Sequence, residues 1–340
     1  MGAQELHETA KAIVADHKGI LAADESTGTM RKRLDSVGVE STEENRRFYR
    51  GLLFSAPGME EHVGGVILYD ETIRQSADDG TPFPELLASK GVVPGIKVDT
   101  GAHDLAGHPG EKVTEGLDGL RARFEEYHGL GARFSKWRAV ITIGEGIPTR
   151  ACIRANAHAL ARYAALSQEA GIVPIVEPEV LMDADNTIER CYEVTAQTLH
   201  WTFHELGALG VDLKGILLKP NMVISGKGCP EQAPAEKIAE LTIDCFLRHV
   251  PAAVPGIVFL SGGQSEVEAT ENLNAINRIG GPWPLSFSYG RALQASALKA
   301  WNGEPANAEA AQQVFVHRAR MNSLAVAGEW SAELEQPVAA

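Results

Sequence analysis

Cysteine is scarce in this sequence, and its positions form no pattern. The 340 residues include four cysteines, without a C-x-x-C pair or a close-set framework: Cys152, Cys191, Cys229 and Cys245. A small disulfide-stabilised fold is therefore excluded, and we expect free thiols in a reducing compartment. The chain also lacks the run of about 18 apolar residues that a membrane span needs, and an apolar secretory segment at its start. We expect a cytoplasmic protein that does not use a membrane as a partner.

Positive charge is also low. Lys and Arg number 31 against 45 Asp and Glu, which gives a formal net charge of −14. Such a surface repels nucleic acids and anionic membranes, so we expect no nucleic acid partner. Any anionic ligand must then bind in a local cationic pocket. With 44% apolar and 22% charged residues, the composition excludes a disordered chain.

Linkers, low-complexity tracts and residue-level repeats are missing as well, which favours a single domain over residues 1–340. What does recur is a short apolar run rich in Val, Ile and Leu, followed by a helix-like segment. Runs of this kind are typical of strands buried on both faces. Eight of them are present, at residues 19–24, 64–70, 93–99, 134–141, 172–179, 215–219, 256–261 and 285–289.

Eight alternations of strand and helix predict an α/β fold of the (β/α)8 or TIM-barrel type. Helical periodicity separates the runs, for example at residues 150–170, 187–209 and 234–250. An open doubly wound sheet is less favoured, because it usually places a Gly-rich dinucleotide loop after its first strand, where this chain has Asp24-Glu-Ser-Thr27. The remaining length fits an N-terminal helix, a helix at 42–55 and a C-terminal tail from about 329 to 340.

The active site of such a barrel is built at the carboxyl ends of its strands. Polar side chains end most of the runs here: Asp24, Lys97, Asp99, Lys136, Arg138, Glu177, Glu179, Lys219 and Ser261. Burial lowers the pKa of a lysine and frees its amine as a nucleophile, especially beside a second cation. Any one of these charges could be a solvated loop residue or a plain ion pair. Three lysines at one barrel mouth nevertheless predict a site that binds an anion and forms an imine, although the pattern does not distinguish which lysine reacts.

Two Gly-containing segments at the last two strand ends are candidate phosphate cradles. Phe259-Leu-Ser-Gly-Gly-Gln264 follows the seventh run, and Ser288-Tyr-Gly-Arg291 follows the eighth, with a helix expected from Arg291. Backbone N–H groups in such turns converge on oxyanions, and these two loops form the recurrent phosphate site of barrels.

Histidine supplies no convincing metal site. His200 and His204 lie one helical turn apart, but the sequence offers neither the Glu of H-E-x-x-H nor a third ligand nearby. His103 and His108 lie in a Gly-rich segment that we expect to be a solvated loop. We therefore expect no metal.

Long motifs occur along the chain in a fixed order, among them Gly19-Ile-Leu-Ala-Ala-Asp-Glu-Ser-Thr-Gly28, Lys136-Trp-Arg138, Leu218-Lys-Pro-Asn-Met-Val223, Phe259-Leu-Ser-Gly-Gly-Gln-Ser265 and Ser288-Tyr-Gly-Arg291. Over residues 6–328 the chain resembles the class I fructose-bisphosphate aldolases of glycolysis. The resemblance implies reversible cleavage of fructose 1,6-bisphosphate into dihydroxyacetone phosphate and glyceraldehyde 3-phosphate through a lysine imine. It also implies an enzyme of the carbon–carbon lyase class that needs no cofactor, binds sugar phosphates and forms a homotetramer.

The resemblance also assigns roles to residues. Lys219 matches the imine-forming lysine, Glu177 the acid and base of carbinolamine dehydration, and Glu179 its supporting carboxylate. Asp24 matches the carboxylate at the C4 hydroxyl, and Lys136 the ammonium that keeps Lys219 deprotonated. Substrate and phosphate contacts fall on further positions: Arg138, Lys97, Ser261, Gly262, Gly263, Ser288, Gly290 and Arg291, with Ser26, Lys32 and Arg33 at the second phosphate.

One departure from the family pattern concerns the C-terminal segment. Animal and plant members end in a mobile tail with a terminal tyrosine that assists enamine protonation, whereas no tyrosine follows Tyr289 here. We expect a polar, mobile tail that does not take over this chemistry, which leaves the preference between fructose 1,6-bisphosphate and fructose 1-phosphate open. The alternative functions are a lysine-dependent aldolase or transaldolase for another sugar phosphate and a non-catalytic barrel scaffold.

Overall fold

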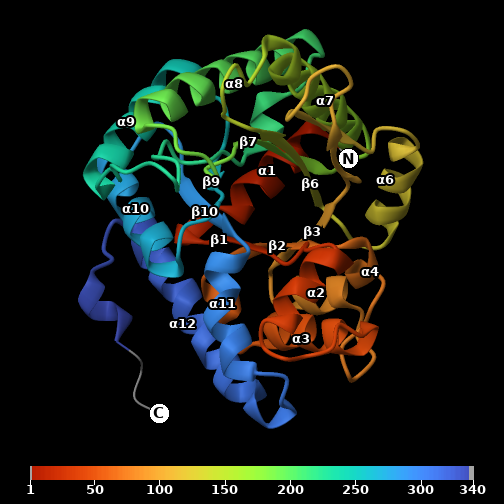
Figure 1. The fold of residues 1–340 in the computed structure, drawn as a ribbon. Coiled ribbons are helices and arrows are strands. Elements are labelled where there is room, and N and C mark those ends of the chain that lie inside the picture. Colours follow the sequence, from red (N-terminus) through yellow and green to blue (C-terminus); the bar gives the residue numbers. More distant parts are fainter. Residues whose placement is uncertain (1, 337–340) are drawn as a thin grey trace.

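The computed structural model describes residues 2–336, and its centre is a closed barrel of eight parallel strands (Figure 1). Around the barrel each strand pairs with its neighbours in chain order, and the last strand pairs with the first. Every predicted apolar run overlaps one strand, so the (β/α)8 prediction is confirmed. The strands are β1 (Gly19–Ala22), β2 (Val63–Leu68), β3 (Val93–Lys97), β6 (Phe134–Ile141), β7 (Val173–Val180), β8 (Leu217–Leu218), β9 (Ile257–Phe259) and β10 (Leu285–Tyr289).

Helices surround the barrel and connect its strands (Figure 1). Five of them begin after a Ser or Thr whose hydroxyl accepts a hydrogen bond from the backbone N–H three residues later: Ser26, Thr42, Thr149, Thr187 and Ser265. Such caps satisfy the free N–H groups of a first helical turn. The helices are α1 (Ala3–Ile13), α2 (Thr27–Asp35), α3 (Glu43–Ser55), α4 (Asp70–Ile73), α5 (Phe83–Ser89), α6 (Leu120–Gly129), α7 (Arg150–Glu169), α8 (Ile188–Ala208), α9 (Ala235–His249), α10 (Glu266–Ile279), α11 (Arg291–Trp301) and α12 (Ala308–Ala327), with short 3₁₀ turns at 15–17, 59–61, 213–215, 305–307 and 332–335.

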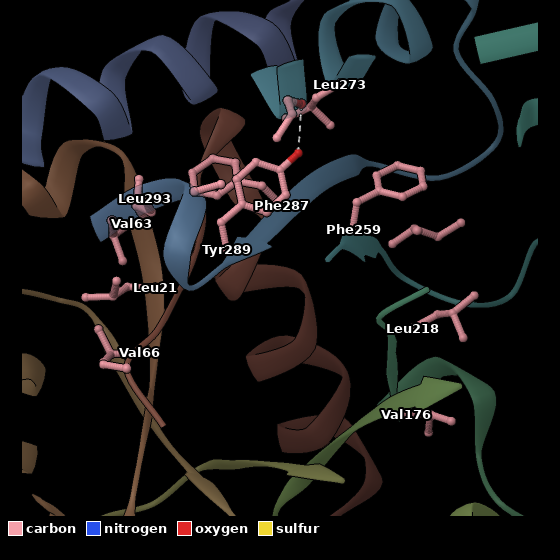
Figure 2. Packing of buried hydrophobic residues seen from close by; sticks show 14 of the residues in the cluster. Leu21, Val63, Val66, Val176, Leu218, Phe259, Leu273, Phe287, Tyr289 and Leu293 are labelled. Atoms are coloured by element: carbon pink, nitrogen blue, oxygen red, sulfur yellow. Dashed lines mark hydrogen bonds between the residues drawn. The ribbon is translucent and has the colours of Figure 1, made fainter. Parts of the chain in front are cut away.

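A continuous hydrophobic core lies between the barrel wall and the outer helices (Figure 2). Phe259 of β9 stacks on Phe246 of α9 with ring centroids 5.7 Å apart. Tyr289 of β10 is fully buried, and its hydroxyl donates a hydrogen bond to the Ala269 carbonyl of α10 at 3.0 Å. These contacts fix β9 and β10, whose carboxyl ends carry the two predicted phosphate loops.

Helix α1 fills the amino end of the barrel. Its residues Leu6, Ala10 and Ile13 are buried in one cluster with barrel residues such as Phe134. The approach is so close that a Cβ atom on Gly64 would lie 2.1 Å from the Ile13 carbonyl oxygen. Because this end is closed by apolar packing, the carboxyl ends of the strands form the mouth where a site can lie.

The Gly-rich segment after β3 is solvent-exposed at His103, as expected, but it forms a hairpin instead of an irregular loop. Residues Gly101–Asp104 (β4) and Lys112–Glu115 (β5) pair as an antiparallel hairpin. Glu111 is buried beside it, and its carboxylate accepts hydrogen bonds from the backbone N–H and the hydroxyl of Thr149, both at 2.6 Å. The hairpin is thereby attached to the start of α7, a contact between positions 38 residues apart that local pattern does not reveal.

The C-terminal segment also differs from expectation, because it is docked onto α10 and α12 as far as residue 336. Trp330 is buried, its backbone N–H donates to the Asn274 side chain at 3.1 Å, and its indole N–H donates to Glu335 at 2.7 Å. Glu335 also forms an ion pair with Arg318 of α12 at 2.6 Å. The expected mobility of the tail is therefore wrong for this stretch, although most of residues 331–336 are exposed, as expected of a polar segment. Residues 337–340 lie outside the described part of the chain.

The remaining expectations from composition concern thiols and membranes. All four cysteines are buried and free, as predicted. Within residues 2–336, no helix is both long enough and apolar enough to cross a membrane.

Candidate active site at the barrel mouth

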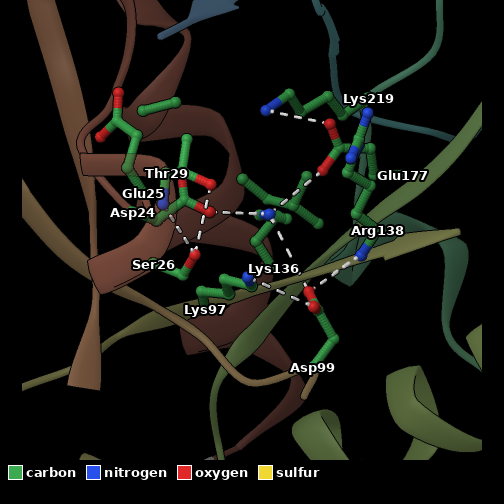
Figure 3. A network of polar contacts seen from close by, with 12 residues as sticks. Asp24, Glu25, Ser26, Thr29, Lys97, Asp99, Lys136, Arg138, Glu177 and Lys219 are labelled. Atoms are coloured by element: carbon green, nitrogen blue, oxygen red, sulfur yellow. Dashed lines mark hydrogen bonds and ion pairs between the residues drawn. The ribbon is translucent and has the colours of Figure 1, made fainter. Parts of the chain in front are cut away.

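The strand register brings the predicted charged residues to one end of the barrel (Figure 3). Lys97 on β3 lies opposite Lys136 on β6, and Arg138 on β6 lies opposite Glu177 on β7. Because side chains alternate between the two faces of a strand, Trp137 points outward from the barrel, where it stacks on Tyr163 of α7. The polar side chains of adjacent strands therefore converge on the inner face, as the period of two predicts.

Lys136 is the centre of the buried charge network. Its Nζ atom lies 2.7 Å from Asp24, 3.5 Å from Glu177 and 3.9 Å from Asp99 (Figure 3). Burial alone would lower the pKa of Lys136, but the three carboxylates outweigh it and raise the pKa above its usual range. Burial would likewise raise the pKa of Asp24, yet the surrounding lysines, Lys136 foremost, hold that pKa well below its ordinary value. Both groups are therefore charged at neutral pH.

Glu177 connects two ammonium groups. Its Oε1 lies 3.2 Å from Nζ of Lys219, which follows β8, and its Oε2 lies 3.5 Å from Nζ of Lys136. Burial would raise the pKa of Glu177, but Lys219, Lys136 and Arg138 hold it below the ordinary value. Glu177 is therefore a carboxylate at neutral pH, and its two oxygens face the ammonium groups of Lys219 and Lys136.

Two further cations lie nearer to solvent than this network. Arg138 donates from Nε to Glu179 at 2.5 Å, and 43% of its side chain is exposed. Lys97 lies 3.5 Å from Asp99 and is 18% exposed. Glu179 thus orients Arg138 in this structure, and each cation at the rim of the mouth is paired with one carboxylate.

The loops after β9 and β10, which the sequence predicts to be phosphate cradles, contact each other at the barrel mouth. Arg291 begins α11, and its Nη2 donates to the Gly262 carbonyl at 3.4 Å. Ser261 is buried, and Gly262 has a positive φ of +56° that favours glycine. The Ser288 hydroxyl is buried and makes no hydrogen bond with any described residue. Gly290 runs close to β1, since a Cβ there would lie 3.3 Å from the Ala22 carbonyl oxygen.

The three residues expected at a second phosphate lie on or next to α2, but they differ in how closely they are connected to the barrel mouth. Ser26 caps this helix, accepting the Thr29 N–H at 3.4 Å. Arg33 lies 3.5 Å from the carboxylate of Glu25, which packs beside the mouth. Lys32 is exposed and forms no ion pair within residues 2–336. The structure therefore links Ser26 and Arg33 to the mouth more closely than Lys32.

Two carboxylates of the site, Asp99 and Glu25, received no role in the prediction, although Asp99 was recognised as a charged residue at a strand end. Asp99 contacts both Lys97 and Lys136, and its position two residues after Lys97 on the same strand end was an available signal. Glu25 is buried next to Asp24; burial raises its pKa, and Arg33 and Arg50 oppose the shift only in part. The only feature of the sequence that pointed to Glu25 is its position directly after Asp24 at the end of a strand.

Comparison with known proteins gives one consistent answer. A family profile described as fructose-bisphosphate aldolase class-I, glycolytic, matches residues 5–340. A protein of Xanthomonas campestris named "Probable fructose-bisphosphate aldolase class 1" is 59% identical, over 97% of this chain and 99% of that protein. "Fructose-bisphosphate aldolase C-B" of Danio rerio is 52% identical, over 96% of this chain and 91% of that protein. A solved structure of fructose-bisphosphate aldolase from Plasmodium falciparum, in complex with TRAP and a small-molecule inhibitor, is 48% identical with a TM-score of 0.96, covering 97% of this chain and 96% of that one.

Proposed function

The chain belongs to the class I fructose-bisphosphate aldolase family, whose members cleave fructose 1,6-bisphosphate to dihydroxyacetone phosphate and glyceraldehyde 3-phosphate, and we propose that Lys219 forms the imine on which this cleavage depends. The enzyme is a carbon–carbon lyase. The observation that supports the choice of lysine is the ion pair between Lys219 and Glu177 at 3.2 Å.

The carboxylate partners distinguish the three lysines at the mouth. Lys136 pairs with three carboxylates, which keep it charged, and Lys97 pairs with Asp99 at the rim. Within the described chain, Lys219 has the carboxylate of Glu177 alone and shares it with Lys136. Two cations on one carboxylate disfavour each other, and Lys219 is the one with fewer compensating charges. Lys219 is therefore the lysine whose charge has the fewest carboxylate partners, and we assign the nucleophile to it on this ground.

One proton transfer, from Lys219 to Glu177, produces both the nucleophile and the acid that imine formation needs. When the ammonium of Lys219 gives a proton to Glu177, the products are a neutral amine and a neutral carboxylic acid. The amine adds to the C2 carbonyl of the sugar and forms a carbinolamine. Glu177 then returns its proton to the departing hydroxyl, so that water leaves and a protonated imine remains.

Asp24 is the base for the carbon–carbon cleavage. Its carboxylate is held at 2.7 Å from Lys136 and is ionised at neutral pH. It takes the proton of the C4 hydroxyl while the C3–C4 electron pair moves toward the protonated imine, which becomes an enamine. The imine acts as the electron sink, so a weak base is sufficient.

The phosphate groups fix the sugar along the mouth. β9 is the neighbour of β8, and the C1 phosphate is one carbon away from the imine carbon at Lys219. We assign this phosphate to Ser261, Gly262, Ser288 and Arg291, where the Ser288 hydroxyl has a free donor. The C6 phosphate is assigned to the side of Ser26 and Arg33, with Lys97 and Arg138 along the chain of the sugar. Remote binding of this kind orients the reacting carbons.

We further propose that the reaction needs no metal or other cofactor, because the imine supplies the electron sink. The enzyme acts in glycolysis and gluconeogenesis in the cytoplasm, and it assembles as a homotetramer. The acidic composition and the buried free thiols support a cytoplasmic location.

Borohydride trapping tests the assignment. Dihydroxyacetone phosphate and borohydride together inactivate the enzyme irreversibly, and mass spectrometry finds the reduced adduct on Lys219. Lys219→Met removes the adduct, whereas Lys214→Met, at the opposite end of β8, does not. An adduct on Lys97 or Lys136 would overturn the assignment, and EDTA-sensitive activity restored by zinc would overturn the metal-free mechanism.

A further inference from the structure

A second cation besides Arg291 lies against the glycine pair after β9. Lys227 belongs to the loop after β8, and its side chain packs directly over Gly263. A Cβ atom on Gly263 would lie 1.9 Å from both Cε and Nζ of Lys227. Gly262, the other member of the pair, contacts Arg291 through its carbonyl. The glycine pair is therefore flanked by an ammonium group and a guanidinium group.

Backbone hydrogen bonds hold Lys227 in this place. Its N–H donates to the Met182 carbonyl at 2.8 Å, and the next residue, Gly228, donates to Ala184 at 2.9 Å. A Cβ on Gly226 would lie 2.3 Å from the Ala184 carbonyl oxygen, so the two loops touch. The ammonium group itself lies 3.0 Å from Asp183. The position of Lys227 is thus set by paired loops after β7 and β8, rather than by a free surface chain.

Two features leave this cation available to a ligand. The Lys227 and Asp183 side chains are 43% and 67% exposed, and exposed ion pairs of this kind stabilise a protein little. The Gly263 N–H donates to the sulfur of Met182, which is a weak acceptor. A phosphate oxygen is a stronger acceptor than this sulfur for the Gly263 N–H, and it forms a charge-assisted hydrogen bond with the Lys227 ammonium.

We propose that Lys227 is a substrate-binding residue that contacts the C1 phosphate of the sugar, together with Arg291. The proposal rests on the proposed function, because it takes the phosphate beside the imine carbon as its ligand. On binding, the phosphate replaces Met182 at the Gly263 N–H and shares the ammonium of Lys227 with Asp183. Lys227 therefore contributes to affinity for phosphorylated ketoses and not to the chemistry at C2.

The test compares Lys227→Met with Lys214→Met, the same change on an exposed lysine at the amino end of the barrel. For Lys227→Met we expect the KM for fructose 1,6-bisphosphate to rise about tenfold, with kcat changed less than about twofold. Borohydride trapping should need about tenfold more dihydroxyacetone phosphate, while trapping with dihydroxyacetone, which has no phosphate, stays unchanged. Equal values for the two variants would remove Lys227 from the subsite.

Asp183→Asn distinguishes two roles of Lys227: binding of phosphate by its charge, and a purely structural role in which its ion pair with Asp183 holds the two loops together. If Lys227 acts by its charge, loss of Asp183 leaves phosphate binding equal or tighter. If the Lys227–Asp183 pair only holds the loops, both variants weaken binding alike, which would contradict the proposal. Calorimetric titration of the wild type and Lys227→Met with inorganic phosphate measures phosphate binding without an imine, and the difference between the two proteins reports on the C1 subsite. A wild type that binds phosphate through Lys227 but forms no adduct would refute the proposed function and not this contact.

Discussion

The Nζ atom of Lys219 lies 3.2 Å from Oε1 of Glu177, and neither side chain is more than 6% exposed. Water does not screen a pair at this depth, so the position of one proton decides the reactivity of both groups. With the proton on Lys219 the site holds an ion pair, and with the proton on Glu177 it holds a nucleophile and an acid.

Glu177→Gln tests this proton transfer. The amide keeps the shape of the side chain but accepts no proton from Lys219. We expect imine formation with dihydroxyacetone phosphate to slow by about 10²-fold or more, measured by borohydride quenching in single turnovers. Glu169→Gln, on the exposed end of α7, is the matched control. An unchanged rate in Glu177→Gln would exclude this residue as the acid and base.

Asp24→Asn separates cleavage from imine formation. Because Asn accepts no proton from the C4 hydroxyl, cleavage of fructose 1,6-bisphosphate should slow by about 10²-fold or more. Dihydroxyacetone phosphate has no C4, so its imine should still be trapped on Lys219 at a rate much closer to that of the wild type. If both rates fall equally, Asp24 supports the whole network rather than acting as the base.

The buried carboxylates predict a dependence of stability on acid. The pKa values of Asp24 and Glu177 are lowered on folding from ordinary values of 3.8 and 4.5. A lowered pKa contributes stability that is fully present above the unfolded value and is lost as the pH falls toward the folded value. The melting temperature should therefore fall as the pH drops below about 4.5. The part of this fall that comes from Asp24 should disappear in Asp24→Asn, and an identical profile in the two proteins would contradict the ion-pair account.

Trp330→Ala tests the docked C-terminal segment. It removes a buried indole and its hydrogen bond to Glu335, so we expect a loss of about 3 kcal/mol in the free energy of unfolding. Turnover at 25 °C should change little, because Trp330 packs on α10 and α12 rather than at the mouth. Thermal unfolding and steady-state rates give the two readouts. An unchanged melting temperature would show that the segment is not docked in solution.

The barrel and most strand-end residues were predictable because each signal is local. Strands buried on both faces need continuous apolar runs, and the period of two places Lys136 with Arg138 on the inner face. Asp24, Lys136 and Glu177 therefore converge as soon as the barrel closes, since each follows from its own strand.

The choice among the three lysines was not predictable from spacing, because it depends on contacts between strands. Lys136 meets Asp24 across 112 positions in the chain, and only the folded register shows that Lys219 has fewer carboxylates. The docking of Trp330 has the same origin, since its partner Asn274 is 56 residues away. The composition of that segment is polar on average, and this average does not show that burial of the single side chain of Trp330 docks the segment on the barrel.

Closure of the amino end by α1 has a kinetic consequence. Substrate enters and both products leave through the mouth, and in the proposed mechanism one product is still covalently attached to Lys219 after cleavage. Glyceraldehyde 3-phosphate must then depart first, and dihydroxyacetone phosphate follows once its enamine has taken a proton at C3 and the resulting imine has been hydrolysed by water. Steady-state inhibition should accordingly be that of an ordered Uni Bi reaction, with dihydroxyacetone phosphate competitive against fructose 1,6-bisphosphate and glyceraldehyde 3-phosphate noncompetitive.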